Sequence, residues 1–411
     1  MDVAPNSSAP RAWAILRAVG FVALLSGMVL TGVLLGHPEL RGGWSWSAVV
    51  VLLVLGVLPV LAVRPRPLLA TVAALVLGSL VAYVVVAAPS QREAEASAGS
   101  GWTAAPYSEA PPGVAPAPVP PPLQRPTLGI STATIEDLDA FILATGTHPE
   151  VFDVFESWSL DRPLDRYVAD SVAARGVRLS ITWEPWVADG GARQRGYTLA
   201  SIINGSHDAY IDMFATSIKE FGHPVTIRLM HEMNGNWYPW GLGVNGNRPG
   251  EYVQAWQHVH DRFAALGVTD VAWMWAPNAV YTGSAPLASL YPGDVYVDDV
   301  GLSNYNWGHY SHDGFATEWM SFGELFDESI AQLQALTTRP LWVAETGSSD
   351  KGGSKAAWVT DTLAEASARP EIAGLIWFDQ VDDGAGVDWR IETEADVVDA
   401  WRAGYTSRPP G

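Results

Sequence analysis

The chain has 411 residues and no cysteine, and its formal net charge at pH 7 is −20. Residues 1–126 carry seven Arg and five acidic side chains, which leaves 17 basic and 39 acidic residues in 127–411, a net charge of −22. A region this acidic is repelled by nucleic acids, and the lack of cysteine excludes disulfides, thiol nucleophiles and thiolate metal sites. Nucleic acid is therefore not an expected partner.

The N-terminal region contains three uncharged apolar runs, at residues 19–36, 44–63 and 68–88. Each is long enough to cross roughly 30 Å of hydrocarbon as a helix. A cleaved signal peptide would offer one short run, so three runs favour retained transmembrane helices, with a buried hairpin of a soluble protein as the alternative. The lipid bilayer is therefore an expected partner.

Positively charged residues set the expected orientation of these spans. Arg11 and Arg17 precede the first run, and Arg64 and Arg66 lie between the second and the third. Because positive charge concentrates on the cytoplasmic side, we expect the N-terminus in the cytoplasm. Three spans then place the rest of the chain on the other side. The sequence predicts a multi-pass protein of the cell membrane with an extracytoplasmic C-terminal domain.

A linker is expected at residues 89–126, which are rich in Pro, Ala and Ser and show no apolar periodicity. Such a composition cannot bury a core, so the segment is predicted to be disordered and to hold the next domain away from the membrane. Recognition of the proline run by a partner is the alternative.

Residues 127–411 alternate short β-branched or aromatic runs with longer segments of helical period. Apolar stripes at 210–221, 252–266, 325–336 and 358–363 predict helices. This order predicts an α/β fold, the (β/α)8 TIM barrel. A doubly wound open sheet is the alternative, but no glycine-rich phosphate-binding loop follows the first strand. The eight predicted strands are 127–130, 151–155, 179–183, 226–230, 271–275, 300–303, 341–345 and 373–378.

Polar side chains follow the fourth and the seventh predicted strands. The fourth ends in His-Glu-Met-Asn-Gly at 231–235, and the seventh ends in Glu345. The C-terminal ends of barrel strands carry the chemistry of these folds. Two carboxylates there suit glycosidic cleavage, with retention when they lie about 5 Å apart and inversion when the gap is wider. A structural carboxylate paired with Arg is the alternative for each.

These residues resemble glycoside hydrolase family 26, whose best-known members are β-mannanases with catalytic glutamates on strands four and seven of a TIM barrel. The resemblance covers nearly all of residues 127–411. It rests on Arg-x-x-His-Glu-Met-Asn-Gly-x-Trp at 228–237, on Val-Gly-x-x-x-Tyr-Asn-Trp at 300–307 and on the strand before Glu345. It implies that Glu232 is the general acid/base and Glu345 the nucleophile of a retaining enzyme. The charge of Glu345 should raise the pKa of Glu232.

The same resemblance implies polar contacts around the two carboxylates. Arg228, His231 and Tyr305 would orient the carboxylates and the sugar hydroxyls, with Tyr305 donating to Glu345. Asn234 is an expected substrate contact because it belongs to the same motif. For His231 taken alone, a structural histidine is the alternative.

Four tryptophans are expected at the substrate. Trp237 resembles the aromatic residue near the scissile bond, and Trp377 resembles the platform under the central sugar. Trp183 would line the cleft, and Trp240 lies beside a polar strand end. Tryptophans on helical stripes, such as Trp256, are expected to pack in the core instead.

Other hydrolase classes and metals receive little support. A zinc-protease helix needs a second histidine four positions after His231, where Gly235 stands, and no Gly-x-Ser-x-Gly elbow is present. The acidic pairs at 298–299 and 382–383 could bind calcium, although solvated loops are favoured. We therefore predict no metal site and no cofactor.

The expected partner of the site is a β-linked polysaccharide. By the resemblance, mannan or glucomannan is the first expectation, and mixed-linkage β-glucan or β-1,3-xylan is the alternative. The residues Trp-Phe-Asp-Gln at 377–380 and Tyr-Pro-Trp at 238–240 depart from the mannan-cleaving pattern. A non-catalytic carbohydrate-binding or exopolysaccharide-handling membrane protein is the alternative of another class.

Overall fold

Eight parallel strands close into a barrel in the computed structural model, which describes residues 125–188, 190–312, 315–382 and 384–408. The eighth strand pairs with the first in parallel, from Thr127↔Gly374 to Ser131↔Phe378, so the sheet has no edge. All eight predicted strands and the TIM barrel are confirmed, and the open-sheet alternative is wrong. The strands are β1 Thr127–Ser131, β2 Val151–Ser157, β3 Arg178–Glu184, β4 Val225–Leu229, β5 Val271–Trp275, β6 Asp299–Ser303, β9 Leu341–Thr346 and β10 Ile372–Phe378.

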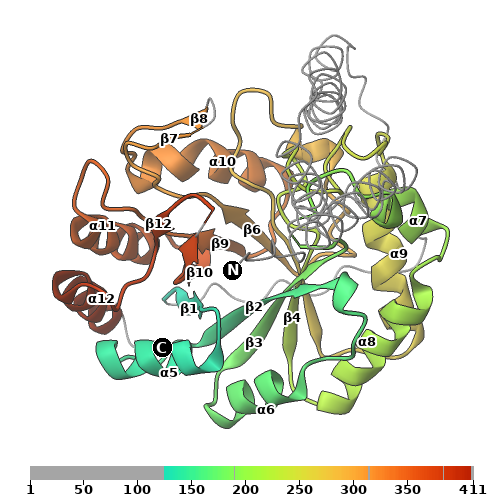
Figure 1. The fold of residues 1–411 in the computed structure, drawn as a ribbon, viewed down its shortest axis with the longest axis horizontal. Coiled ribbons are helices and arrows are strands. Elements are labelled where there is room, and N and C mark those ends of the chain that lie inside the picture. Colours follow the sequence, from blue (N-terminus) through green and yellow to red (C-terminus); the bar gives the residue numbers. More distant parts are fainter. Residues whose placement is uncertain (1–124, 189, 313–314, 383, 409–411) are drawn as a thin grey trace, which may run out of the picture. The chain divides into compact units, whose positions relative to one another are not determined.

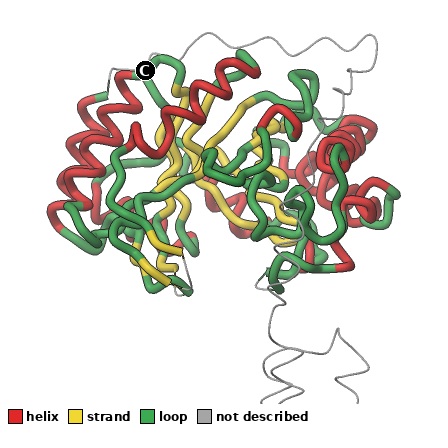
Figure 2. Tube along the Cα trace, turned by 90° about the horizontal axis from the view of Figure 1, so that it is seen from above, coloured by secondary structure: helices red, strands yellow, loops and turns green. Residues whose placement is uncertain are grey.

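Helices surround the strands, as Figures 1 and 2 show. The four predicted apolar stripes are confirmed, and the one at 210–221 ends where Gly222 takes a left-handed conformation as its C-cap. Between β5 and β6 the described residues form only a short 3-10 turn, η4 (Leu287–Ser289). The α-helices are α5 Ile135–Thr145, α6 Arg166–Ala174, α7 Leu199–Ile203, α8 Asp208–Phe221, α9 Glu251–Ala265, α10 Phe322–Leu336, α11 Lys355–Ala368 and α12 Ala395–Ser407.

Short elements decorate the loops that follow the strands. Two antiparallel hairpins are formed by β7 (Ser311–His312) with β8 (Phe315–Ala316) and by β11 (Val381–Asp382) with β12 (Val387–Asp388). Single 3-10 turns η2 (Trp158–Leu160) and η3 (Arg195–Tyr197) follow β2 and β3.

The main core lies between the outward faces of the strands and the helices. The expected core residue Trp256 is fully buried there, and its indole N–H donates to Tyr296 O at 3.2 Å. Burying a large apolar side chain stabilises the fold by about 1.5–3 kcal/mol, so this layer supplies most of the stability.

A smaller apolar cluster fills the inside of the barrel. It contains Met274 and Ile376 around the indole of Trp342. A Cβ at Gly374 would lie 2.2 Å from that indole, so only glycine leaves room for it. The interior is therefore a packed floor, and the polar side chains described below lie above it.

No helix in the described part of the chain is long and apolar enough to cross a membrane. The three predicted spans, at 19–36, 44–63 and 68–88, and the predicted linker as far as residue 124 lie outside the described residues.

Candidate active site

A layer of hydrogen-bonded polar residues crosses the barrel above its apolar floor. Ser180 and Thr182 of β3 donate to the two carboxylate oxygens of Asp153 on β2, at 2.6 and 2.8 Å. Thr182 in turn accepts from Nε of Arg228 on β4, at 2.8 Å, and Arg228 Nη1 donates to Ser303 Oγ at 3.3 Å. The guanidinium of Arg228 is completely buried, so it must be paired to be tolerated there.

Glu345 is the partner of that buried guanidinium. Arg228 Nη2 donates to Glu345 Oε2, and the hydroxyl of Tyr305 donates to Glu345 Oε1, as the family resemblance implies. A carboxylate that accepts at both oxygens has the hydrogen-bonding pattern of the ionised form. Burial and the charge of Glu345 raise the pKa of Tyr305 well above its ordinary value, so its hydroxyl stays a donor.

A β-bulge aims Glu345 into the barrel mouth. Between β6 and β9 the register passes from Leu302↔Val343 to Ser303↔Glu345, so two residues of β9 face one residue of β6. Ala344 belongs to the apolar cluster inside the barrel, yet Glu345 next to it also reaches the inward-facing Arg228. The extra residue in the bulge turns the side chain, which strict alternation would point outward.

Glu232 follows β4 on an unusual stretch of backbone. Met230 and Glu232 have positive φ values of 45° and 54°, in the left-handed region that costs a non-glycine residue about 1 kcal/mol. The turn is held from two sides, because Met230 N donates to Trp183 O at 3.1 Å and Glu232 N donates to Ala276 O at 2.7 Å. Strain of this kind is retained where the surrounding structure fixes a functional side chain.

The carboxyl of Glu232 has two side-chain donors. Trp237 Nε1 donates to Oε2 at 2.7 Å, and Asn278 Nδ2 donates to Oε1 at 3.1 Å. Burial, and then the negative charge of Glu345, raise the pKa of Glu232 to about 7, in the direction expected from the sequence. Its ordinary value is 4.5, so at mildly acidic pH Glu232 carries a proton that it can give away.

His231, which precedes Glu232 in the chain, is buried. Burial, and then the positive charge of Arg228, hold the pKa of His231 well below its ordinary value. Its Nε2 is 3.1 Å from the hydroxyl of Tyr238, and its Nδ1 is 4.0 Å from Glu184 Oε1. Burial raises the pKa of Glu184 to about 8, and Trp186 donates to its Oε2 at 3.2 Å. This neutral layer avoids placing further charges against the two glutamates.

Two of the tryptophans that were predicted to contact the substrate lie outside the barrel wall. These two predictions are therefore wrong. Trp183 is fully buried, stacks on Phe214 of α8 at 4.6 Å and donates to Tyr210 Oη at 3.1 Å. Trp377 is fully buried, packs against Trp358 of α11 and donates to Trp389 O at 2.9 Å. Strand alternation turns both indoles towards the helices.

Two further expected contacts support the site from behind. Trp240 is fully buried; its ring stacks under Tyr238 at 4.5 Å, and its indole donates to His231 O at 2.6 Å. It therefore has no surface for a sugar, and that prediction is wrong. Asn234 is also buried and forms two hydrogen bonds with the backbone of Asn278, of 2.8 and 2.9 Å, so it positions the residue that contacts Glu232.

Four residues of the mouth were missed by sequence reasoning. Phe155 and Phe378 lie edge to face at 6.0 Å, and Phe378 also meets Tyr305 at 5.8 Å. Tyr281 is 43% exposed and stacks on Trp237, itself 38% exposed, at 5.9 Å. The fourth is Asn278. For Phe155 and Phe378 the signal was their place near strand ends, whereas Tyr281 and Asn278 lie in an irregular loop without a motif.

The described residues contain no group of three or more His, Cys, Asp or Glu side chains that could hold a metal ion. Asp298 and Asp299, one of the acidic pairs considered for calcium, instead accept hydrogen bonds from Trp273 N at 2.8 Å and Trp342 Nε1 at 3.1 Å. Of the other pair, Asp383 lies outside the described residues.

The fold and the site define a class of protein: a (β/α)8 barrel with one glutamate of raised pKa and one ion-paired glutamate at the ends of its fourth and seventh strands. That pairing is the one that glycoside hydrolases use. A model of glycosyl hydrolase family 26 matches residues 196–327. The chain is similar to this family over these residues.

The chain is also similar to an endoglucanase and to a mannosidase. Endoglucanase H of Acetivibrio thermocellus is 33% identical over 261 residues, which cover 62% of this chain and 27% of that protein. A mannan endo-1,4-β-mannosidase of Bacillus subtilis is 29% identical over 125 residues, which cover 28% of this chain and 34% of that protein. The chain thus spans about a quarter to a third of the length of these relatives.

A solved structure supports the fold. A family 26 protein from Muricauda superposes with a TM-score of 0.52 at 18% identity, covering 69% of this chain and 86% of that structure. At this identity the likeness concerns the barrel alone.

Proposed function

We propose that this chain is a retaining endo-β-glycosidase that hydrolyses a β-linked polysaccharide by double displacement. The observation that carries the proposal is the pair of glutamates in one barrel mouth. Glu345 is held as a hydrogen-bond acceptor by Arg228 and Tyr305, while the pKa of Glu232 is raised to about 7 by burial and by Glu345. Glu345 is thus oriented by two donors as a nucleophile, while Glu232 can supply the proton that the first step requires.

In the first step a carboxylate oxygen of Glu345 attacks the anomeric carbon of the bound sugar. The bond from that carbon to the glycosidic oxygen breaks, and Glu232 gives its proton to this oxygen, which leaves as a hydroxyl. In the second step Glu232, now ionised, takes a proton from water as the water oxygen attacks the same carbon. The ester bond to Glu345 breaks, and two inversions leave the original configuration.

The leaving sugar is assigned to the side of the cleft that carries Trp237 and Tyr281. The indole N–H of Trp237 donates to Glu232, the proposed acid/base, and the Trp237 ring stacks on the exposed ring of Tyr281. Flat exposed aromatic faces suit the C–H faces of pyranose rings. Gly235 makes this arrangement possible, because a Cβ there would lie 2.4 Å from the Trp237 ring. The retained sugar is then placed above Phe155 and Phe378, on the side of β1, β2 and β10.

Two backbones compete as substrate. The motifs favour mannan or glucomannan. The similarity over 261 residues to a protein named endoglucanase favours a β-glucan instead. β-1,3-Xylan is the third member of the set expected from the family. We propose hydrolysis of pure mannan, mixed-linkage β-glucan and β-1,3-xylan side by side, with product sizes measured over time; internal cleavage gives a ladder of oligosaccharides from the start.

The mechanism is tested by following the first-formed anomer with proton NMR. Retention is expected, and an inverted first product would remove Glu345 as the nucleophile. Glu345→Gln should abolish turnover and keep binding; it is preferred to Glu345→Ala because alanine would leave the buried Arg228 unpaired, which costs about 3–5 kcal/mol. Wild-type protein that binds glycans and cleaves none on a broad panel would favour the non-catalytic alternative.

We also propose that the enzyme is anchored in the cell membrane by the runs at 19–36, 44–63 and 68–88, with the barrel on the extracytoplasmic side. The support is their length, their lack of charge and the positions of the flanking Arg residues. Expression of the full chain followed by carbonate extraction and protease treatment of intact cells tests it. A carbonate-soluble protein, or a barrel protected from external protease, would contradict the proposal.

A further inference from the structure

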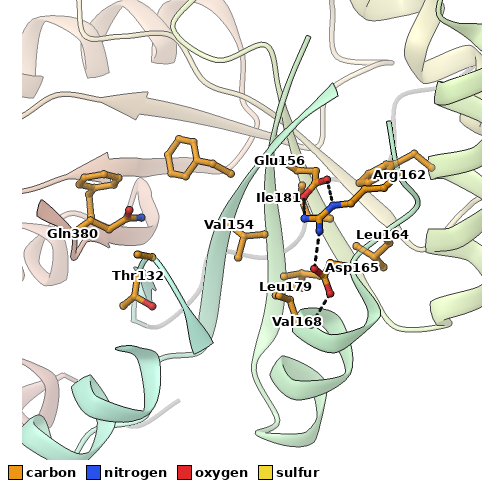
Figure 3. A pocket seen from close by; sticks show the side chains of 14 residues that line it. Thr132, Val154, Glu156, Arg162, Leu164, Asp165, Val168, Leu179, Ile181 and Gln380 are labelled. Atoms are coloured by element: carbon orange, nitrogen blue, oxygen red, sulfur yellow. Dashed lines mark hydrogen bonds and ion pairs between the residues drawn. The ribbon is translucent and has the colours of Figure 1, made fainter. Parts of the chain in front are cut away.

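The barrel wall opens between its first two strands. β1 and β2 pair only at Gly129↔Val151 and Ile130↔Phe152, whereas β2 and β3 stay paired as far as Ser157↔Glu184. The upper half of β2 therefore has no hydrogen-bonded neighbour on the β1 side. A cavity of about 400 Å³ lies at this opening, as Figure 3 shows.

The cavity leads from the barrel mouth to the space between β2 and α6. Its lining begins with Phe155 and Phe378, on which the retained sugar is proposed to lie, and includes Thr132 and Gln380 at the ends of β1 and β10. In Figure 3, Val154 lies between Thr132 and Gln380 on one side and the polar residues at the far end on the other.

Charged side chains occupy the far end of the cavity. Arg162 donates to both oxygens of Glu156, from Nε at 3.0 Å and from Nη2 at 2.9 Å, and its Nη1 donates to Asp165 Oδ2 at 3.0 Å. Each oxygen of the two carboxylates already accepts a hydrogen bond, so a hydroxyl group would donate to a second lone pair, and two carboxylates against one guanidinium disfavour an anionic ligand. Leu164 and, from α6, Val168 also line this part of the cavity, while the side chains of Arg162 and Asp165 are partly exposed to solvent.

We infer that this cavity binds a single neutral sugar that branches from the polysaccharide backbone at the retained side of the cleft. The inference rests on the proposed function, which fixes that side. The cavity has an apolar floor, including Leu179 and Ile181, and polar groups at both ends, which suits a ring with C–H faces and hydroxyls. Its volume of about 400 Å³ lies at the lower end of the range for small-molecule sites, which suits one branch sugar rather than a continuing backbone.

The test compares branched and unbranched forms of one backbone: mannan with and without single galactosyl branches, and β-1,4-glucan with and without single xylosyl branches. Val154→Phe fills the cavity and keeps the ion pairs, and Gln380→Ala removes a polar group at the entrance. Each should lower kcat/KM on the branched polymer at least tenfold and change it less than twofold on the unbranched one. Leu143→Phe, on the exposed face of α5, is the matched control and should change neither.

Equal losses on both polymers, or no loss on either, would overturn the inference, and thermal unfolding of each variant separates these results from misfolding. Binding gives a readout that does not need turnover. Saturation-transfer NMR of branched oligosaccharides with Glu345→Gln should detect contacts of the branch sugar, and adding Val154→Phe should remove them. If the branch sugar contacts the protein but the wild type shows no turnover, the proposed cavity is supported and the proposed hydrolase activity is refuted. If the wild type shows turnover but no branch contacts, the hydrolase activity is supported and the proposed cavity is refuted.

Discussion

Removing the side chain of Asn278 should move the basic limb of the pH–rate profile to higher pH. Asn278 donates to Glu232 at 3.1 Å, and a hydrogen bond to a carboxyl oxygen favours the ionised form. Bonds to charged groups contribute about 1.5–3 kcal/mol, and 1.36 kcal/mol corresponds to one pKa unit. The bond is long, so the lower end applies, and Asn278→Ala should shift the limb from near pH 7 upward by roughly one pH unit.

The assay is kcat/KM between pH 5 and 9, because this ratio reports the ionisation of the free enzyme. The backbone of Asn278 should stay in place, since Asn234 accepts from its N–H at 2.9 Å. Asn204→Ala, at the end of α7 and remote from the mouth, is the control and should leave the limb unchanged. A limb that stays put or moves to lower pH in Asn278→Ala would refute the assignment of that limb to Glu232.

Three further outcomes follow from the same contacts. Tyr305→Phe removes a donor to Glu345 and should lower kcat roughly 10- to 100-fold in steady-state assays; an unchanged kcat would contradict the contact's role. Trp377→Ala should cost roughly 3–5 kcal/mol in denaturant unfolding with little change in KM, whereas Phe378→Ala should raise KM at a smaller loss of stability; the reverse pattern would restore Trp377 as the sugar platform. Burial raises the pKa of Glu184 from 4.5 to about 8, so the folded state keeps a proton that the unfolded state loses, and stability falls as pH rises across that window. Glu184→Gln should make the decline in Tm from pH 5 to 8 shallower, and an identical slope would argue against a buried protonated carboxyl.

The order of the strands could be predicted from sequence because each strand is a short run rich in β-branched or aromatic residues. The two glutamates could be located because they end such runs, where barrel chemistry takes place. These two features need only local patterns, and they place the proposed catalytic pair at the ends of the fourth and seventh strands.

The direction of individual side chains needed knowledge of register that sequence does not carry. In β10, Ile376 faces the barrel interior, Trp377 the helices and Phe378 the mouth, so Trp377, the residue expected to be the sugar platform, points away from the mouth. In β9, Ala344 faces the barrel interior, so strict alternation of side chains would point Glu345 outward. The bulge turns the side chain of Glu345 to Arg228. The bulge depends on pairing with β6, which is set by tertiary structure.

Loop residues of the site carried still less signal. Asn278 and Tyr281 lie between β5 and η4, where the described chain forms no helix whose period could reveal a buried face. Asn278 reaches Glu232 because Asn234, more than forty positions earlier, binds its backbone. Such a contact joins two loops and leaves no pattern in either one.

The left-handed backbone at Met230 and Glu232 sets catalysis and folding against each other. At position 232 glycine would adopt this φ value without steric cost, so a lineage under no selection to keep this carboxylate could relieve the backbone strain by a single substitution, whereas Met230 is a buried core residue. Laboratory evolution under selection for heat resistance alone should therefore discard the acid/base early. Any thermostabilised variant of this enzyme has to be screened for turnover, because the two properties diverge at this turn.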